Sequence, residues 1–296
     1  MKKFLALFLC VLMAVSMIAS ASAIKPNKEY AAAKDGDILY TANFKDAAFA
    51  KLTTGTTATF TPSSDGKSAT IKGTGSKDVA NWWGVKLETL TAANGEKYTI
   101  TYKVKSNGTV GKNNSIGVGG LWAGADDKFY HAYGNYGTVD AKGSTADRRI
   151  SISLAGSKMG DYNTDVKNPD MDKDGFVTAK QEIDTAAKKV RTYALIGGKW
   201  VKTLEKDFTT FDAKNACMSV VIYSYYAVVD STVKDFKIYK GINLTDAQLN
   251  PVETTAATTK APTTKPASPA TFDAAVVLAV VASMAGAGAV VSKKKR

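Results

Sequence analysis

Three aspartates stand on alternate residues in the stretch DMDKDGFVTAKQE, which begins at Asp170 and reaches Gly175 at its sixth position. Calcium takes about six to eight oxygen ligands, and loops that bind it supply carboxylates on alternate residues with a glycine at the sharp turn. The spacing therefore predicts a structural Ca²⁺ ion in this loop. The expected ligands are Asp170, Asp172, Asp174, Phe176, Thr178 and Gln181.

The end of the same stretch allows a second interpretation. The loop resembles that of an EF-hand, which closes with a bidentate glutamate, whereas Gln181 is neutral and Glu182 comes one residue later. Thr178 and Gln181 also form a capping-box pattern, which predicts a helix running to about Lys189 with the aspartates as solvated turn residues. Three neighbouring carboxylates repel one another unless a cation neutralises them, and this favours the calcium interpretation.

Aromatic and amide side chains gather in the stretch from residue 122 to residue 136. Flat aromatic rings pack on the C–H faces of sugars, and a few polar groups fix the hydroxyls. The stretch predicts a carbohydrate site, with packing in the core as the alternative for the same rings. The expected ligand-binding residues are Trp122, Tyr130, Tyr133, Asn135 and Tyr136.

Catalytic signals are weak throughout the chain. His131 is its single histidine, so a Ser/His/Asp triad and a histidine-rich zinc site both lack support. The few glutamates are scattered and do not form the closely spaced carboxylate pair that glycoside hydrolysis requires. We therefore expect a protein that is not an enzyme.

The elements that position these residues have the two-residue period of β-strands. About ten short runs rich in Val, Ile, Thr and Tyr are separated by Gly, Asn and Asp turns. Clear examples are residues 97–105, 217–226 and 231–239. The pattern predicts a mainly β fold, an antiparallel β-sandwich of the jelly-roll kind, in residues 24–250. One loop-rich, partly helical insertion is expected at about residues 155–190.

The order of these strands resembles a known family. The opening GDILYTANF, the middle WWGVKLETLTAANGEKYTITYKVKSNG and the closing VVDSTVKDFKIYKG look like the jelly-roll carbohydrate-binding modules attached to secreted glycanases. The resemblance implies that the last strand returns beside the first, and that the fold holds sugar on a concave face or at loop tips. An adhesion or structural surface protein that binds protein partners is the competing class.

Both ends of the chain carry targeting signals. Residues 1–23 combine two lysines, an apolar run and a small-residue cleavage site, which predicts a secretory signal peptide. Residues 251–271 form a linker rich in Thr, Ala and Pro, which cannot build a core. Residues 272–296 contain an uncharged run and a basic tail, which predict a transmembrane helix with its tail in the cytoplasm.

This arrangement resembles the surface proteins that Gram-positive bacteria attach to the cell wall through a sortase. Ser268, Pro269, Ala270 and Thr271 stand where that family has its sorting motif, and the resemblance implies cleavage at Thr271. A single-pass membrane anchor is the alternative. Either way, the expected location is the extracellular face of the cell membrane or the cell wall.

Net charge and cysteine content exclude other classes. The formal charge of +12 falls to +6 when the six basic residues of the two targeting ends are set aside. The remaining charge is spread along the chain without a basic stripe, so we do not expect nucleic acid as a partner. Cys217 is the one cysteine beyond the signal peptide, and its apolar surroundings predict an inert core thiol.

Overall fold

The computed structural model describes most of the chain between residues 25 and 250. The described residues are 25–51, 58–74, 80–92, 95–107, 115–122, 129–131, 133–134, 153–154, 166, 168–207, 214–225 and 228–250. The chain divides into two compact units, Met1–Pro251 and Val252–Arg296. The predicted signal peptide, the linker with its sorting-like motif and the apolar anchor lie outside the described residues. Within the described ranges, no helix is long and apolar enough to cross a membrane.

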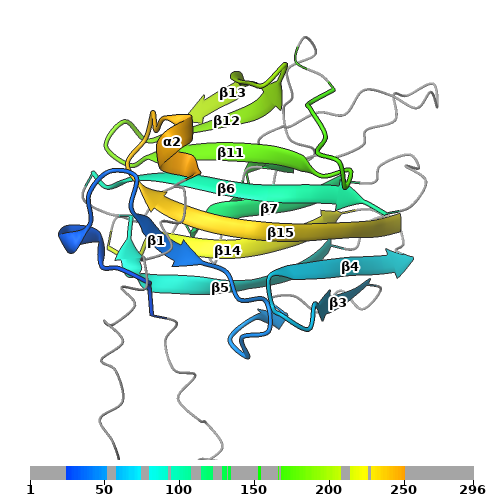
Figure 1. Cartoon of the computed structure of the whole chain (residues 1–296). Helices are drawn as coiled ribbons and strands as arrows, with labels where there is room; N and C mark the ends of the chain where they lie inside the picture. Colours follow the sequence, from blue (N-terminus) through cyan, green and yellow to red (C-terminus); the bar gives the residue numbers. More distant parts are fainter. Residues whose placement is uncertain are drawn as a thin grey trace, which may run out of the picture. The chain divides into compact units, whose positions relative to one another are not determined.

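Eight antiparallel strands form the front sheet, which lies in the foreground of Figure 1. Its order is β13 (Lys199–Asp207), β12 (Lys189–Ile196), β11 (Val177–Asp184), β6 (Lys97–Ser106), β15 (Val228–Lys240), β4 (Ser68–Thr74) and β3 (Ala58–Pro62). β1 (Ile38–Thr41) also pairs with β15, with Ile38 opposite Tyr239. The last strand therefore returns beside the first, as expected.

Seven strands of the described part form the rear sheet. Its order is β10 (Ser153–Leu154), β8 (Phe129–His131), β7 (Ser115–Trp122), β14 (Cys217–Tyr225), β5 (Ala80–Thr91) and β2 (Ala50–Lys51), and β9 (Tyr133–Gly134) pairs with β7. The helices of the described part are the one-turn 3₁₀ helix η1 (Tyr30–Ala32) and the four-residue α2 (Asp246–Leu249). β-strands therefore carry nearly all the regular structure.

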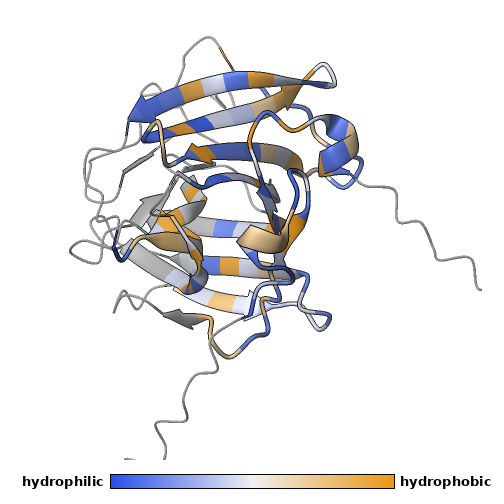
Figure 2. Ribbon diagram, turned by 90° about the vertical axis from the view of Figure 1, so that its left-hand side faces the viewer, coloured by the Kyte–Doolittle hydropathy of each residue, from blue (hydrophilic) through white to orange (hydrophobic). Residues whose placement is uncertain are grey.

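The core follows from the period-two pattern of the strands. In β6 the side chains of Tyr98, Ile100, Tyr102 and Val104 are fully buried and alternate with polar or half-buried neighbours. Figure 2 shows this alternation as changing colours along the ribbons of the strands. Burying an aliphatic or aromatic side chain of this size contributes about 1.5–3 kcal/mol. Alternation on this scale fixes which face of each strand turns toward the core.

Direct contacts join the two sheets face to face. The rings of Phe60 on β3 and Trp83 on β5 stack with their centroids 5.8 Å apart. A side chain added at Gly120 on β7 would meet Ile100 of β6 at 2.5 Å, so the sheets approach closely there. The prediction of a mainly β, antiparallel sandwich is confirmed.

The predicted helix at residues 178–189 is wrong. This segment forms β11, which lies between β6 and β12 in the front sheet. Ala179, Gln181 and Ile183 alternate toward the core with the period of a strand, and residues 185–188 form a turn. The predicted insertion at 155–190 therefore ends before residue 177, and residues 155–165 lie outside the described part.

Candidate functional site

The side chain of Asp170 accepts hydrogen bonds from a turn and is not part of a metal centre. Its Oδ1 accepts a hydrogen bond from the backbone N–H of Gly197 at 3.1 Å, and its Oδ2 accepts one from Gly198 at 2.8 Å. These two glycines have φ angles of 58° and 72° and form the turn between β12 and β13. Asp170 therefore stabilises a hairpin that is distant from it in the sequence.

Asp172 organises the turn that leads into β11. Its Oδ1 accepts hydrogen bonds from the backbone N–H groups of Asp174 at 3.0 Å and Phe176 at 2.9 Å, and its Oδ2 lies 3.0 Å from Lys103 Nζ. Gly175, with a φ of 81°, closes this turn by donating to the carbonyl of Asp172. Burial acts to raise the pKa of Asp172, but these hydrogen bonds and the charge of Lys103 hold it below its usual value.

The six predicted calcium ligands do not meet. Asp174 is exposed and pairs with the neighbouring Lys173 at 3.3 Å, while Thr178 faces away from the core. Gln181 points between the sheets, where its Nε2 donates to the carbonyl of Val118 at 2.7 Å. In the described part of the chain, no three His, Cys, Asp or Glu side chains are grouped to hold a metal ion. The residues therefore do not fit a Ca²⁺ ion, because backbone amides and Lys103 already compensate the carboxylate charge.

A buried ionic cluster lies a few residues further along, on the outer side of β11. Lys180 Nζ lies 3.3 Å from Glu182 Oε1, and the two side chains are 6% and 0% exposed. Glu182 also accepts hydrogen bonds from Tyr193 Oη at 2.7 Å and from the backbone N–H of Asn243 at 3.0 Å. Burial and the contact with Glu182 raise the pKa of Tyr193. This cluster fixes the terminal segment 241–250 to the front sheet.

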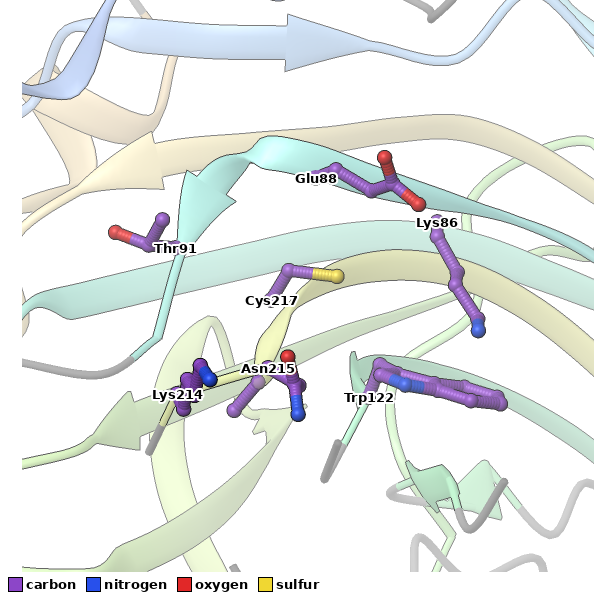
Figure 3. A pocket seen from close by; sticks show the side chains of 8 residues that line it. Lys86, Glu88, Thr91, Trp122, Lys214, Asn215 and Cys217 are labelled. Carbon is purple, nitrogen blue, oxygen red and sulfur yellow. The ribbon is translucent and has the colours of Figure 1, made fainter. Parts of the chain in front are cut away.

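A cavity of about 490 Å³ lies where β5 and β7 end and β14 begins. Antiparallel pairing sets Cys217 opposite Trp122, and Ser219 opposite Lys86, so residues from three separate parts of the sequence meet here. The lining residues are Lys86, Glu88, Thr91, Trp122, Lys214, Asn215, Ala216 and Cys217, most of which are labelled in Figure 3. We call this space the Trp122 cavity.

Trp122 forms a wall of this cavity and is only 5% exposed. The ammonium group of Lys86 lies 3.5 Å from the centroid of its ring, an arrangement that Figure 3 shows. A contact of this kind is worth about 0.5–2 kcal/mol and holds the two side chains together. Trp122 is therefore an oriented wall rather than an open stacking platform.

The remaining predicted sugar-binding residues are described only in part. Antiparallel pairing sets Tyr130 of β8 opposite Leu121, and Tyr133 of β9 opposite Gly117. Both residues therefore lie beside β7, the strand that ends with Trp122. Asn135 and Tyr136 lie outside the described residues. The backbone thus brings part of the predicted aromatic group beside β7.

Hydrogen-bonding side chains line much of the Trp122 cavity. Lys86 and Lys214 offer ammonium groups, Asn215 offers an amide, and Glu88 is the single carboxylate of the described lining. A pair of carboxylates for glycoside hydrolysis is thus missing from that lining. Burial raises the pKa of Cys217 to about 11, so the thiol stays protonated at neutral pH and is a poor nucleophile.

Most of these polar groups cannot be predicted from the sequence. Lys86, Glu88 and Asn215 lie far from Trp122 along the chain and share no motif with it. Only the pairing of β14 with both β5 and β7 brings them together. No local signal in the sequence could have found them.

Sandwich topology and a polar cavity at one end define a β-sandwich protein with a candidate binding site. No protein-family model and no curated protein matches the chain. Among solved structures, lectin I-B4 from Griffonia simplicifolia is 12% identical with a TM-score of 0.42, covering 68% of this chain and 97% of that one. The Lotus tetragonolobus seed lectin is 10% identical with a TM-score of 0.43 and the same coverage. Similarities at this level assign neither family nor function.

Proposed function

We propose that this chain is a non-catalytic carbohydrate-binding protein displayed at the cell surface, and that the Trp122 cavity receives the sugar. The observation that supports this most directly is the composition of the cavity. An indole wall, two ammonium groups, one amide and one carboxylate surround a space of about 490 Å³. Sugar hydroxyls both donate and accept hydrogen bonds, so a mixed lining of this kind suits them.

Lys86 has a specific part in this proposal. Its ammonium group is held over the Trp122 ring, so the donor is already oriented before a ligand arrives. Lys214 and Asn215 are exposed at the start of β14 and supply further donors and an acceptor. Prior orientation of this kind reduces the entropy lost on binding.

The location at the cell surface rests on the two ends of the sequence. The signal peptide at 1–23 supports export, and the linker at 251–271 with the apolar segment at 272–296 supports anchoring. We propose sortase as a partner because the segment from Ser268 to Thr271 stands at the position of a sorting motif. Calcium is not part of the proposed function.

A protein-binding adhesion module has less support. Surfaces that bind proteins usually present a contiguous apolar patch with aromatic residues. Among the described residues, the exposed large hydrophobic side chains amount to Met171 alone. The described surface therefore favours a polar ligand.

The test is a glycan array probed with the purified full chain and with two variants, Lys214→Ala and Asn215→Ala. These residues are exposed, so the variants should fold, whereas Trp122→Ala would also remove packing. We expect a glycan that binds the native chain and binds each variant about tenfold more weakly, since one hydrogen bond to a charged or polar group is worth about 1–3 kcal/mol.

Lys199→Ala is the matched control, because Lys199 is an exposed lysine on β13, in the other sheet. It should bind like the native chain. An array without any bound glycan, from a chain with a cooperative melting transition, would contradict the proposed function.

A further inference from the structure

A second cavity, of about 560 Å³, lies on the outer side of the front sheet. It crosses the neighbouring strands β15, β6, β11 and β12 and reaches the start of β13. Its lining residues are Thr101, Tyr102, Lys103, Thr178, Leu195, Gly198, Trp200, Asp235, Lys237, Tyr239, Asp246, Leu249 and Asn250. It shares no residue with the Trp122 cavity, and we call it the front groove.

The wall of the front groove is aromatic and firmly held. Trp200 Nε1 donates a hydrogen bond to Asp246 Oδ1 at 2.8 Å, which fixes the plane of the indole. Tyr239 Oη donates to the carbonyl of Leu249 at 2.8 Å, and Leu244 packs in the same small apolar cluster. Four contacting residues from three elements thus keep this wall in place without a ligand.

The floor of the groove is polar and consists of side chains from adjacent strands. Pairing sets Lys237 of β15 opposite Thr101 of β6, and Lys103 of β6 opposite Thr178 of β11. Lys103 is engaged with Asp172 at 3.0 Å. The strands of each pair are about 4.8 Å apart. The two pairs lie two residues apart along β6, so hydroxyl and ammonium groups form two short, parallel rows across the strands.

An irregularity in β15 adds a carboxylate beside these two rows. The register with β6 shifts between Lys234 and Lys237, and within this bulge Asp235 has a φ of 55°. A β-bulge redirects a side chain, and aspartate is among the non-glycine residues that adopt the left-handed region most readily. Asp235 is exposed and lines the groove.

The composition of the groove selects among classes of ligand. Two lysines, Lys103 and Lys237, balance two aspartates, Asp235 and Asp246, so the lining favours a neutral ligand over an anionic polymer. An extended peptide would need a strand with unpaired backbone groups, but β15, β6, β11 and β12 are each paired on both sides. Nucleic acid would need an excess of positive charge.

We propose that the front groove binds a stretch of a neutral, linear polysaccharide, as a second glycan site independent of the Trp122 cavity. The inference rests on the proposed function for the class of ligand only, because the two sites have separate residues and lie in different sheets. The two rows of polar groups suit a chain of sugar rings laid across the strands, with Trp200 packing against one ring.

The test uses calorimetric titration of the full chain with three β-1,4-linked hexasaccharides, those of glucose, xylose and mannose. The groove variants are Asp235→Asn, which retains a residue that tolerates a positive φ, and Thr178→Val, which retains the shape and removes the hydroxyl. The control variant for the other site is Asn215→Ala. We expect one hexasaccharide to bind the native chain, with an affinity reduced about tenfold or more in both groove variants and unchanged in Asn215→Ala.

Melting temperatures within about 2 °C of the native chain would show that the variants fold. Failure of all three hexasaccharides to bind the native chain would overturn the inference. So would binding that weakens in Asn215→Ala and not in the groove variants, although that result would support the Trp122 cavity. Binding of an extended peptide that depends on the groove residues, without binding of any hexasaccharide, would also overturn the inference.

Discussion

Two segments of the chain share the pattern Thr-x-x-Gln and fold differently. Thr245 to Gln248 forms a capping box that opens α2, in which the backbone N–H of Gln248 donates to Thr245 Oγ1 and that of Thr245 donates to Gln248 Oε1. Thr178 to Gln181 lies inside β11 instead, with Gln181 buried in the core. The same local preference thus yields two structures, and neighbouring strands on both sides decide the second one.

The terminal segment that contains the first pattern also contacts β11, the strand that contains the second. The terminal segment 241–250 lies over the outer side of β11, as Figure 1 shows for α2, and the backbone N–H of Asn243 donates to Glu182. Side chains of β11 are therefore buried on both sides, whereas those of α2 are largely exposed. Substitutions in β11 should cost several times more stability than the same substitutions in the terminal segment.

Glu182→Ala should have the largest effect. It leaves Lys180 as a buried charge without its carboxylate partner, and it removes the acceptor of Tyr193 and Asn243. Removing one member of a buried ion pair costs about 3–5 kcal/mol. For a unit of this size we expect a fall of the melting temperature on the order of 10 °C, measured by calorimetry.

Glu205→Ala is the control, because Glu205 also pairs with cations, Lys189 and Arg191, but lies at a partly exposed position on β13. Exposed pairs contribute about 0–1 kcal/mol, so this variant should melt within a few degrees of the native chain. Equal losses in the two variants would show that the outer side of β11 is not buried by the terminal segment.

Gln181→Ala and Gln248→Ala compare the same position of the two patterns. The first leaves the carbonyl of Val118 and the hydroxyl of Tyr102 without their buried donor and opens a small cavity, at a cost of about 2–3 kcal/mol. The second removes a contact at the exposed start of α2 and should cost about 0.5–1 kcal/mol. Denaturant unfolding measures both, and the reverse order would contradict the burial of Gln181 between the sheets.

The strands of the core could be predicted from the sequence because one face of each is apolar. The predicted runs 97–105 and 217–226 match β6, Lys97–Ser106, and β14, Cys217–Tyr225, almost to the residue. β11 was missed because polar residues occupy both of its faces. Gln181 points inward, and Lys180 and Glu182 are buried on the outer side, so hydropathy alternation is absent. A buried polar strand gives the sequence signal of an exposed helix.

The candidate site could be predicted only where its residues are close in the sequence. Trp122 was identified from a cluster of neighbouring aromatics, and the structure places it in a cavity. Its polar partners Lys86 and Asn215 depend on the register of three strands, which no local pattern specifies. The front groove is even harder to predict from the sequence, since the position of Asp235 depends on a bulge in β15.

Thr→Val substitutions at positions 178 and 245 should have a smaller and more selective effect. Valine suits a strand but cannot cap a helix, so Thr245→Val should cost about 1 kcal/mol, while Thr178→Val should stay within about 0.5 kcal/mol. Parallel urea titrations would resolve this difference. A larger loss at Thr178 would mean that its hydroxyl has a structural role in the groove.

Calcium should have the smallest effect, because the aspartates before β11 already have partners. A single bound ion at about 100 times its dissociation constant would add about 2.7 kcal/mol to the free energy of unfolding, whereas we expect millimolar Ca²⁺ to shift the melting temperature by less than about 1 °C.

Acid should act on Asp172 instead. Its pKa is lowered in the fold, so its contribution is complete above the unfolded value of about 3.9 and is lost as the pH falls through the lower folded value. Asp172→Asn should therefore reduce the stability difference between pH 7 and pH 3, and a calcium shift that disappears in this variant would instead make the turn a calcium loop.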